Sequence, residues 1–184
     1  MRVHIRSSRW LSVAAATAAV IAGSVPSVGH ASQGFAPPSG PTRIKTFGGD
    51  PDVGQCIAIK GINSDRENGA RAVQRPCGPD ANQRFTFVSV GGGRYEIRTF
   101  ADNKCLDVAN RSDQNKAQII QFTCHRPGQD NQRFRVVDGP GNTVYLRTFA
   151  PGKCLDVQGA DPNVGAPLIQ YQCQQSTNQR FRFG

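Results

Sequence analysis

Short apolar runs alternate with polar turn residues along most of this chain. Runs such as Cys56–Ile59, Phe85–Phe87 and Tyr95–Arg98 contain β-branched or aromatic residues, and Gly, Asn, Asp and Pro separate them. This pattern is typical of short β-strands joined by turns. It predicts an all-β fold.

The same runs recur three times. The tetrapeptide Asn-Gln-Arg-Phe ends at Phe85, Phe134 and Phe181, and the run Cys-Leu-Asp-Val occurs at 105–108 and 154–157. The copies span about 46–98, 99–147 and 148–184, and each holds roughly four short strands. A period of this length in three copies is short for a solenoid, and the copies are too few for a propeller.

The third copy lacks its last strand, and the N-terminal region supplies the missing pattern. Residues 43–47, Arg-Ile-Lys-Thr-Phe, match Ile-Arg-Thr-Phe at 97–100 and Leu-Arg-Thr-Phe at 146–149. A strand here would complete copy three, join the two ends of the repeat region and leave few free sheet edges. The pattern therefore predicts a β-trefoil over residues 43–184.

Residues 1–31 have the pattern of a secretory signal peptide. Arg2, Arg6 and Arg9 precede an apolar, Ala-rich stretch, and small residues end the segment at Ala31. A membrane anchor is the alternative, but the stretch is short for a span. Residues 32–42, with their Pro, Gly and Ser, are typical of a flexible linker. We expect a secreted, extracellular protein with no membrane span, whose residues 32–184 form one free-standing domain.

The positive charge of the chain is dispersed. There are 22 Lys and Arg against 13 Asp and Glu, and three of the basic residues belong to the predicted signal peptide. The others stand without any run of three. A basic secreted protein can favour anionic surfaces or polysaccharides. The dispersed pattern favours a solvated surface over a nucleic-acid groove, so we expect no nucleic-acid partner.

Six cysteines lie in the repeat region, and their spacing follows the repeat. The first cysteine of each copy is 49 residues from the next, and the second follows the first by 21, 19 and 19 residues. An even count in an exported chain predicts disulfides. The repeat favours the pairs Cys56–Cys77, Cys105–Cys124 and Cys154–Cys173. Zinc ligation is the alternative, but no CxxC motif or Cys/His cluster supports it, so we expect no metal and no cofactor.

The triple pattern, the cysteine pairs and the Cys-Leu-Asp-Val strands together resemble the ricin-B-type lectin domain, a carbohydrate-binding β-trefoil. The resemblance runs from Arg43 to the C-terminus, and the family's Gln-x-Trp motif reads Gln-Arg-Phe in each copy. It implies that Phe85, Phe134 and Phe181 pack in the shared core near the trefoil axis.

The resemblance also implies a sugar pocket in copies two and three. Such a pocket needs a carboxylate that accepts hydroxyl hydrogens, a ring that stacks on the sugar, and polar amides. The predicted carbohydrate-binding residues are Asp107, Phe122, Asn131 and Gln132 in copy two, and Asp156, Tyr171, Asn178 and Gln179 in copy three. The alternative for both aspartates is a structural carboxylate bonded to backbone amides.

Copy one keeps the cysteines and the Gln-Arg-Phe motif, which form the framework of each copy, but it lacks the aspartate and the aromatic residue of the predicted sugar pocket. Ala58 stands at the position of the aspartate, and Arg75 stands at the position of the aromatic residue. The chain also departs from the family at Ile120 and Ile169, where a Gln is frequent; here the Gln follows one residue later and would face the other side of a strand. The framework thus occurs three times, and the sugar chemistry at most twice.

An enzyme is not expected. His125 is the one histidine of residues 32–184, and Asp107 and Asp156 occupy equivalent places in different copies, too far apart to act as a glycosidase pair. We therefore expect a secreted, non-catalytic carbohydrate-binding protein with glycan partners. The alternatives are a recognition subunit of a larger secreted assembly, such as an adhesin or toxin, and a trefoil scaffold that binds no sugar.

Overall fold

The structure is a computed structural model of the chain, and it describes residues 1, 35–47, 54–61, 67–125 and 129–184. The chain divides into two units, 1–31 and 32–184. The predicted signal peptide, apart from Met1, and the start of the predicted linker lie outside the described residues. Within the described ranges, no helix is long and apolar enough to cross a membrane.

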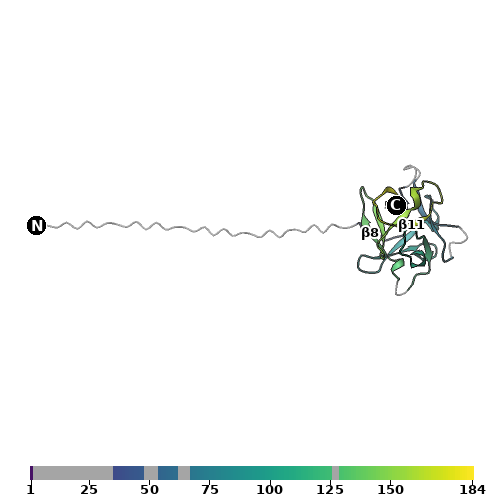
Figure 1. Cartoon of the computed structure of the whole chain (residues 1–184), viewed down its shortest axis with the longest axis horizontal. Helices are drawn as coiled ribbons and strands as arrows, with labels where there is room; N and C mark the ends of the chain where they lie inside the picture. Colours follow the sequence, from purple (N-terminus) through teal and green to yellow (C-terminus); the bar gives the residue numbers. More distant parts are fainter. Residues whose placement is uncertain (2–34, 48–53, 62–66, 126–128) are drawn as a thin grey trace. The chain divides into compact units, whose positions relative to one another are not determined.

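Twelve strands form one antiparallel sheet in the described part of the second unit (Figure 1). The strands are β1 (Ile44–Thr46), β2 (Gln55–Ile59), β3 (Ala72–Pro76), β4 (Phe85–Ser89), β5 (Tyr95–Thr99), β6 (Cys105–Val108), β7 (Ile119–Phe122), β8 (Phe134–Asp138), β9 (Val144–Thr148), β10 (Cys154–Val157), β11 (Leu168–Tyr171) and β12 (Phe181–Phe183). Five single-turn 3-10 helices join them: η1 (Ala81–Gln83), η2 (Ala109–Arg111), η3 (Asp130–Gln132), η4 (Gln158–Ala160) and η5 (Thr177–Gln179).

Strand β1 completes copy three, as the sequence predicted. It pairs with β12 in the register Ile44↔Phe183 and Thr46↔Phe181, and its other edge pairs with β2. An isolated bridge joins Thr42 to Phe85, the first residue of β4. The ladder from β1 through β12, β9, β8, β5 and β4 therefore returns to the N-terminal segment and forms a ring of six strands.

The core repeats with the three copies. Phe85, Phe134 and Phe181 are fully buried, and each would contribute about 1.5–3 kcal/mol from burial. In the same core cluster lie one Ile or Leu each from β1, β5 and β9: Ile44, Ile97 and Leu146. The three disulfides join the predicted partners. The core burial predicted for the Phe residues and the predicted cysteine pairing are both confirmed.

A buried glutamine in each copy ties that copy to its neighbour. Gln74, Gln121 and Gln170 are fully buried, and the side-chain amide of each donates to backbone carbonyls in the loop of another copy. The bonds run from Gln74 to Asp161 and Asn163, from Gln121 to Glu67, and from Gln170 to Ser112 and Gln114. These are the glutamines that stand one residue away from the family's usual position, and they face the neighbouring copy. As a result, a loop of copy two lies beside the hairpin of copy three.

Candidate functional site

The hairpin of β6 and β7 and the helix η3 hold the predicted residues of copy two together. Asp107 lies opposite Ile120, and Cys105 lies opposite Phe122. Asp107, Phe122 and Asn131 line one cavity of about 340 Å³, which we call site two.

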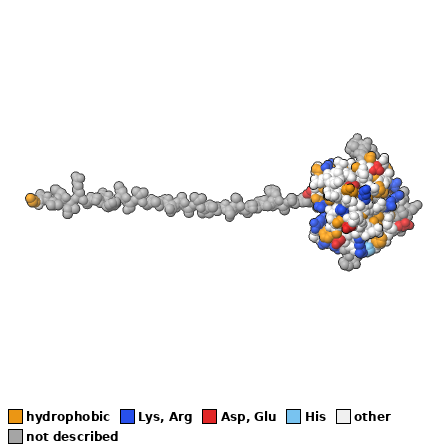
Figure 2. All heavy atoms as spheres, viewed as in Figure 1, with side chains coloured by type: hydrophobic (Ala, Val, Ile, Leu, Met, Phe, Trp, Pro, Cys, Tyr) orange, Lys and Arg blue, Asp and Glu red, His pale blue; other side chains and the backbone are white. Residues whose placement is uncertain are grey.

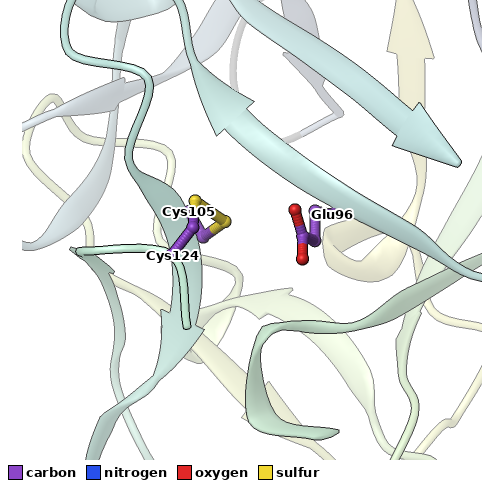
Figure 3. Close-up of side chains that lie close together, drawn as sticks. All are labelled: Glu96, Cys105 and Cys124. Atoms are coloured by element: carbon purple, nitrogen blue, oxygen red, sulfur yellow. A yellow bond between two sulfur atoms is a disulfide. The ribbon is translucent and has the colours of Figure 1, made fainter. Parts of the chain in front are cut away.

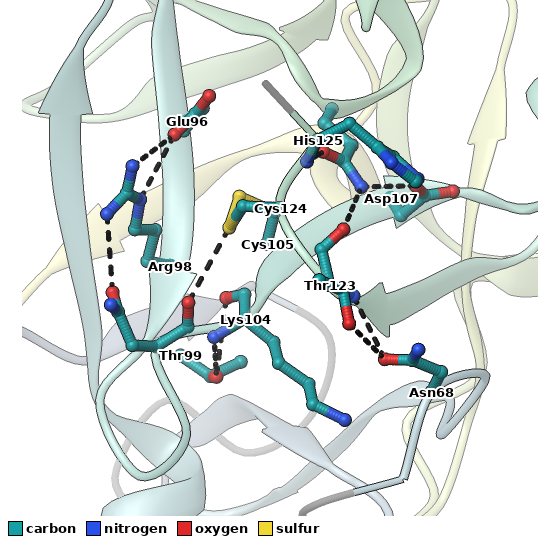
Figure 4. Close-up of a disulfide and its surroundings, with 12 residues drawn as sticks. Asn68, Glu96, Arg98, Thr99, Lys104, Cys105, Asp107, Thr123, Cys124 and His125 are labelled. Atoms are coloured by element: carbon teal, nitrogen blue, oxygen red, sulfur yellow. Dashed lines mark hydrogen bonds and ion pairs between the residues drawn. A yellow bond between two sulfur atoms is a disulfide. The ribbon is translucent and has the colours of Figure 1, made fainter. Parts of the chain in front are cut away.

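Asp107 is buried, and two side-chain amides hold it in place. The Nδ2 of Asn131 donates to Oδ1 at 2.9 Å, and the Nε2 of Gln132 donates to Oδ2 at 2.8 Å. Gln132 also donates to the Thr123 carbonyl at 3.0 Å and accepts from the His125 backbone N–H at 2.9 Å. Figure 4 shows that Asp107, Thr123 and His125 lie beside the Cys105–Cys124 disulfide. The disulfide and the glutamine together therefore fix the position of the carboxylate.

Copy three repeats this geometry. The Nδ2 of Asn178 donates to Oδ1 of Asp156 at 2.9 Å, and the Nε2 of Gln179 donates to Oδ2 at 2.8 Å. Asp156, Tyr171 and Asn178 line a second cavity of about 300 Å³, which we call site three.

The glutamines of both networks lie behind the carboxylates. Gln132 and Gln179 are fully buried and do not line the cavities. The structure thus brings the aspartate, the aromatic residue and the asparagine of each copy to one cavity, and it places the glutamine as a support. The bonds to Asp107 and Asp156 come from side-chain amides, whereas the alternative drawn from the sequence assumed backbone amides.

Burial opposes the ionisation of both aspartates. Desolvation raises the pKa of Asp107 and of Asp156 above the ordinary value of 3.8, although the amide hydrogen bonds oppose this shift. His125 and Arg111 also act to lower the pKa of Asp107. A buried carboxylate with few partners can accept further hydrogen bonds, which are strong because the acceptor is charged.

Copy one shows the same framework without the carboxylate. Ala58 lies opposite Val73, and Arg75 lies opposite Cys56, which confirms the alignment of the repeats. Gln83 still donates to the carbonyl of Pro76 at 3.0 Å, and its oxygen still accepts from the Gly78 backbone N–H at 2.8 Å. The hydrogen bonds of this glutamine to the neighbouring backbone therefore form whether or not an aspartate is present.

Three basic residues that line the cavities were not among the predicted carbohydrate-binding residues. His125 stacks on Phe122 with ring centroids 5.6 Å apart, and Arg111 also lines site two. Lys116, from the loop of copy two, lines site three. The available clue for Lys116 was its place in the repeat, where the other two copies have Gly69 and Gly165.

One group of potential metal ligands lies outside the two cavities. Glu96, Cys105 and Cys124 have ligand atoms within 4.8 Å of one another (Figure 3). The two sulfur atoms are bonded to each other, and the Glu96 carboxylate pairs with the Arg98 guanidinium at 2.7 Å. These donors are therefore engaged in a disulfide and an ion pair.

The visible surface of the second unit is mixed in character (Figure 2). Figure 2 shows Lys and Arg side chains spread over the visible face of the second unit, among uncharged and apolar side chains. Arginines cover aromatic rings, as Arg84 does over the exposed Phe100 and Arg182 does over the half-buried Phe47. The dispersed charge predicted from the sequence thus has local aromatic partners.

The fold is similar to that of several solved proteins. The designed three-fold symmetric protein ThreeFoil is 29% identical, with a TM-score of 0.71 over 78% of this chain and 96% of that chain. An exo-β-1,3-galactanase from Clostridium thermocellum is 21% identical, with a TM-score of 0.70 over 81% of this chain but 31% of the galactanase chain. The Macrolepiota procera ricin B-like lectin, in complex with lactose, is 14% identical, with a TM-score of 0.60 over 81% and 97% of the two chains. The last two likenesses concern the fold alone.

The family comparison covers most of the trefoil. No curated protein matches the chain, whereas the sequence model of the ricin-type beta-trefoil lectin domain matches residues 49–181. This match spans more than half of the chain and includes all three Gln-Arg-Phe motifs. The chain belongs to the family of ricin-type beta-trefoil lectin domains.

Proposed function

We propose that this protein is a secreted, non-catalytic lectin that binds glycans through sites two and three. The observation that carries the proposal is the fixed carboxylate, which lines the same cavity as an aromatic ring and an asparagine in two copies. The family's carbohydrate-binding role supports it, and so does the lactose complex of a lectin with the same fold.

Each cavity has the groups that a sugar ring requires. Each oxygen of Asp107 and Asp156 accepts one amide hydrogen in the structure, which leaves a lone pair on each oxygen for a sugar hydroxyl. Phe122 and Tyr171 present the apolar surface on which the C–H face of the sugar stacks. Because the amides already hold the carboxylates, little ordering is needed when the sugar binds.

The linings favour binding over hydrolysis. Glycosidases act through two carboxyl groups that flank the bond. Among the described residues, Asp107 is the one carboxylate that lines site two, and Asp156 is the one that lines site three. Within that part of the chain, neither cavity pairs its aspartate with a second acid.

Secretion rests on two independent features. Residues 1–31 have the pattern of a signal peptide, and the three disulfides match an oxidising compartment.

A glycan array with site variants tests the proposal. Asp107→Ala and Asp156→Ala should each reduce binding, and the double variant should fail to bind. It should remain folded, because copy one keeps its framework with Ala58. Asp113→Ala, at an exposed position outside both cavities, is the matched control and should bind as the parent does.

A folded double variant that still binds glycans would show that the two carboxylates are structural. Failure of the parent to bind any glycan, together with capture of other secreted proteins from culture medium, would favour a recognition subunit of a larger assembly.

A further inference from the structure

Sites two and three obtain their positive charge from different parts of the molecule. Arg111 lines site two and belongs to the same copy as Asp107. The equivalent residue of copy three is Ala160, which lines site three. The basic residue in the lining of site three is instead Lys116, which the neighbouring copy contributes.

The backbone of Lys116 has an unfavourable conformation for a lysine. Its φ is 70°, and the equivalent Gly69 and Gly165 both have a φ of 92°. Glycine adopts this region freely, whereas a residue with a Cβ is strained there. Strained residues of this kind concentrate at functional sites, so the exception in copy two points to a role for the lysine side chain.

The loop that carries Lys116 is fixed beside site three. The Lys116 backbone N–H donates to the Gln170 carbonyl at 2.9 Å, and the Gln170 side chain donates to the carbonyls of Ser112 and Gln114 at 2.7 and 2.9 Å. The Asn115 side chain accepts from the Gln172 backbone N–H at 3.0 Å. Lys116 is therefore held in the lining by bonds on both sides of it in the sequence.

The two aspartates differ in their charged surroundings. His125 and Arg111 act on Asp107, whereas the groups that lower the pKa of Asp156 are the amides of Gln179 and Asn178. Among the described residues, no cationic side chain contributes to the pKa shift of Asp156. Among the residues that the structure describes, no ion pair involves Lys116, and the flexible stem of a lysine gives its ammonium group reach over the cavity.

We propose that site three prefers a sugar that carries an acidic group, such as a hexuronic acid. This inference rests on the proposed lectin function. Asp156 would accept two ring hydroxyls and repel the acid, and Lys116 would bind the acid at the opposite side of the sugar. The combination fixes the orientation of the sugar as well as its class. Site two has Gly69 at the equivalent junction, and its own basic lining residues, Arg111 and His125, already act on Asp107.

The test isolates site three in an Asp107→Ala background. Binding of the methyl glycosides of galacturonic and glucuronic acid is compared with that of methyl galactoside and methyl glucoside by titration calorimetry. We expect the acidic sugars to bind about threefold to fivefold more tightly, the range of an exposed charge pair, and the preference to shrink with added salt. Lys116→Gly and Lys116→Gln should both remove the preference, because the acidic sugars should lose more affinity than the neutral sugars do. The glycine variant restores the residue found in the other two copies, so its folding is secure.

The outcomes separate this inference from the lectin function. If Asp156→Ala abolishes binding but Lys116→Gly leaves the ratio of acidic to neutral affinity unchanged, the role of Lys116 is overturned and the lectin function stands. An equal loss for acidic and neutral sugars would also overturn it, as would absence of binding to all four glycosides. The lectin function itself fails if the glycan array shows no binding that depends on Asp107 or Asp156.

Discussion

At the scale of single residues, the two aspartates show how a small fold can bury a carboxylate despite the free-energy cost of removing its charge from water. Burial opposes the ionised form of Asp107 and Asp156, and the amides of Asn and Gln partly offset that cost. Ala58 shows that the framework forms without the acid. The aspartates are therefore explained by binding more readily than by stability.

The pH dependence of unfolding should report this cost. The folded pKa of each carboxyl is raised above 3.8, so the folded protein binds these protons more tightly than the unfolded chain does. Their contribution to stability is complete below the unfolded pKa and is lost as the pH rises through the folded pKa. We expect the unfolding free energy of the parent, minus that of the Asp107→Ala/Asp156→Ala variant, to be larger at pH 3 than at pH 7. The parent is then relatively more stable at pH 3. Chemical denaturation at both pH values measures this difference.

Glycan binding should change in the opposite direction, because the ionised carboxylate is the acceptor. It should weaken as the pH falls through the raised pKa. A stability advantage of the parent that grows between pH 3 and pH 7 would mean that the carboxyls are stabilised as ions, and would contradict the direction given above.

At the scale of elements, β1 joins the last copy to the first. Ile44 is fully buried in the core, and Lys45 next to it is exposed on the same strand. We expect Ile44→Ala to lower the unfolding free energy by about 2–5 kcal/mol, through lost burial and a cavity. Lys45→Ala is the matched control and should change it by less than about 0.5 kcal/mol. Equal thermal midpoints for the two variants would contradict the role of β1 in closing the ring.

The buried glutamines make a second link between copies. Gln74 donates to two carbonyls of copy three and accepts from the Thr46 hydroxyl at 3.1 Å. Gln74→Ala removes all three of these buried hydrogen bonds, and we expect a loss of about 2–3 kcal/mol in unfolding free energy. Gln172→Ala, at an exposed position, should be close to neutral in the same denaturation experiment. A neutral Gln74→Ala would show that the loops of copy three hold their place without it.

The repeat made the elements readable from the sequence, but it concealed the contacts between copies. The closing strand could be predicted because residues 43–47 carry the same apolar pattern as two later segments, and the disulfides followed the period. Lys116 could not be assigned to site three, because nothing in the linear order of a repeat says which neighbour's loop reaches a cavity. The role of Gln170 was hidden for the same reason, since its partners lie in copy two.

At the scale of the whole molecule, two sites on one rigid trefoil can engage a repeated glycan together. The second contact is then intramolecular and can raise avidity by about 10²–10⁴-fold. We expect Asp107→Ala alone to reduce retention on an immobilised polysaccharide far more than it reduces affinity for a free monosaccharide at site three. Surface plasmon resonance and calorimetry measure the two quantities. Proportional losses in both would indicate that one site acts alone.

The pairing of β1 with β12 also determines when the fold can be completed. β1 is the first of the twelve described strands to be synthesised, and β12 is the last. The ring therefore stays open until nearly the whole repeat region is available, and contacts between such distant segments form slowly. A chain whose ring closes last stays unfolded for longer, which agrees with the secretion proposed above.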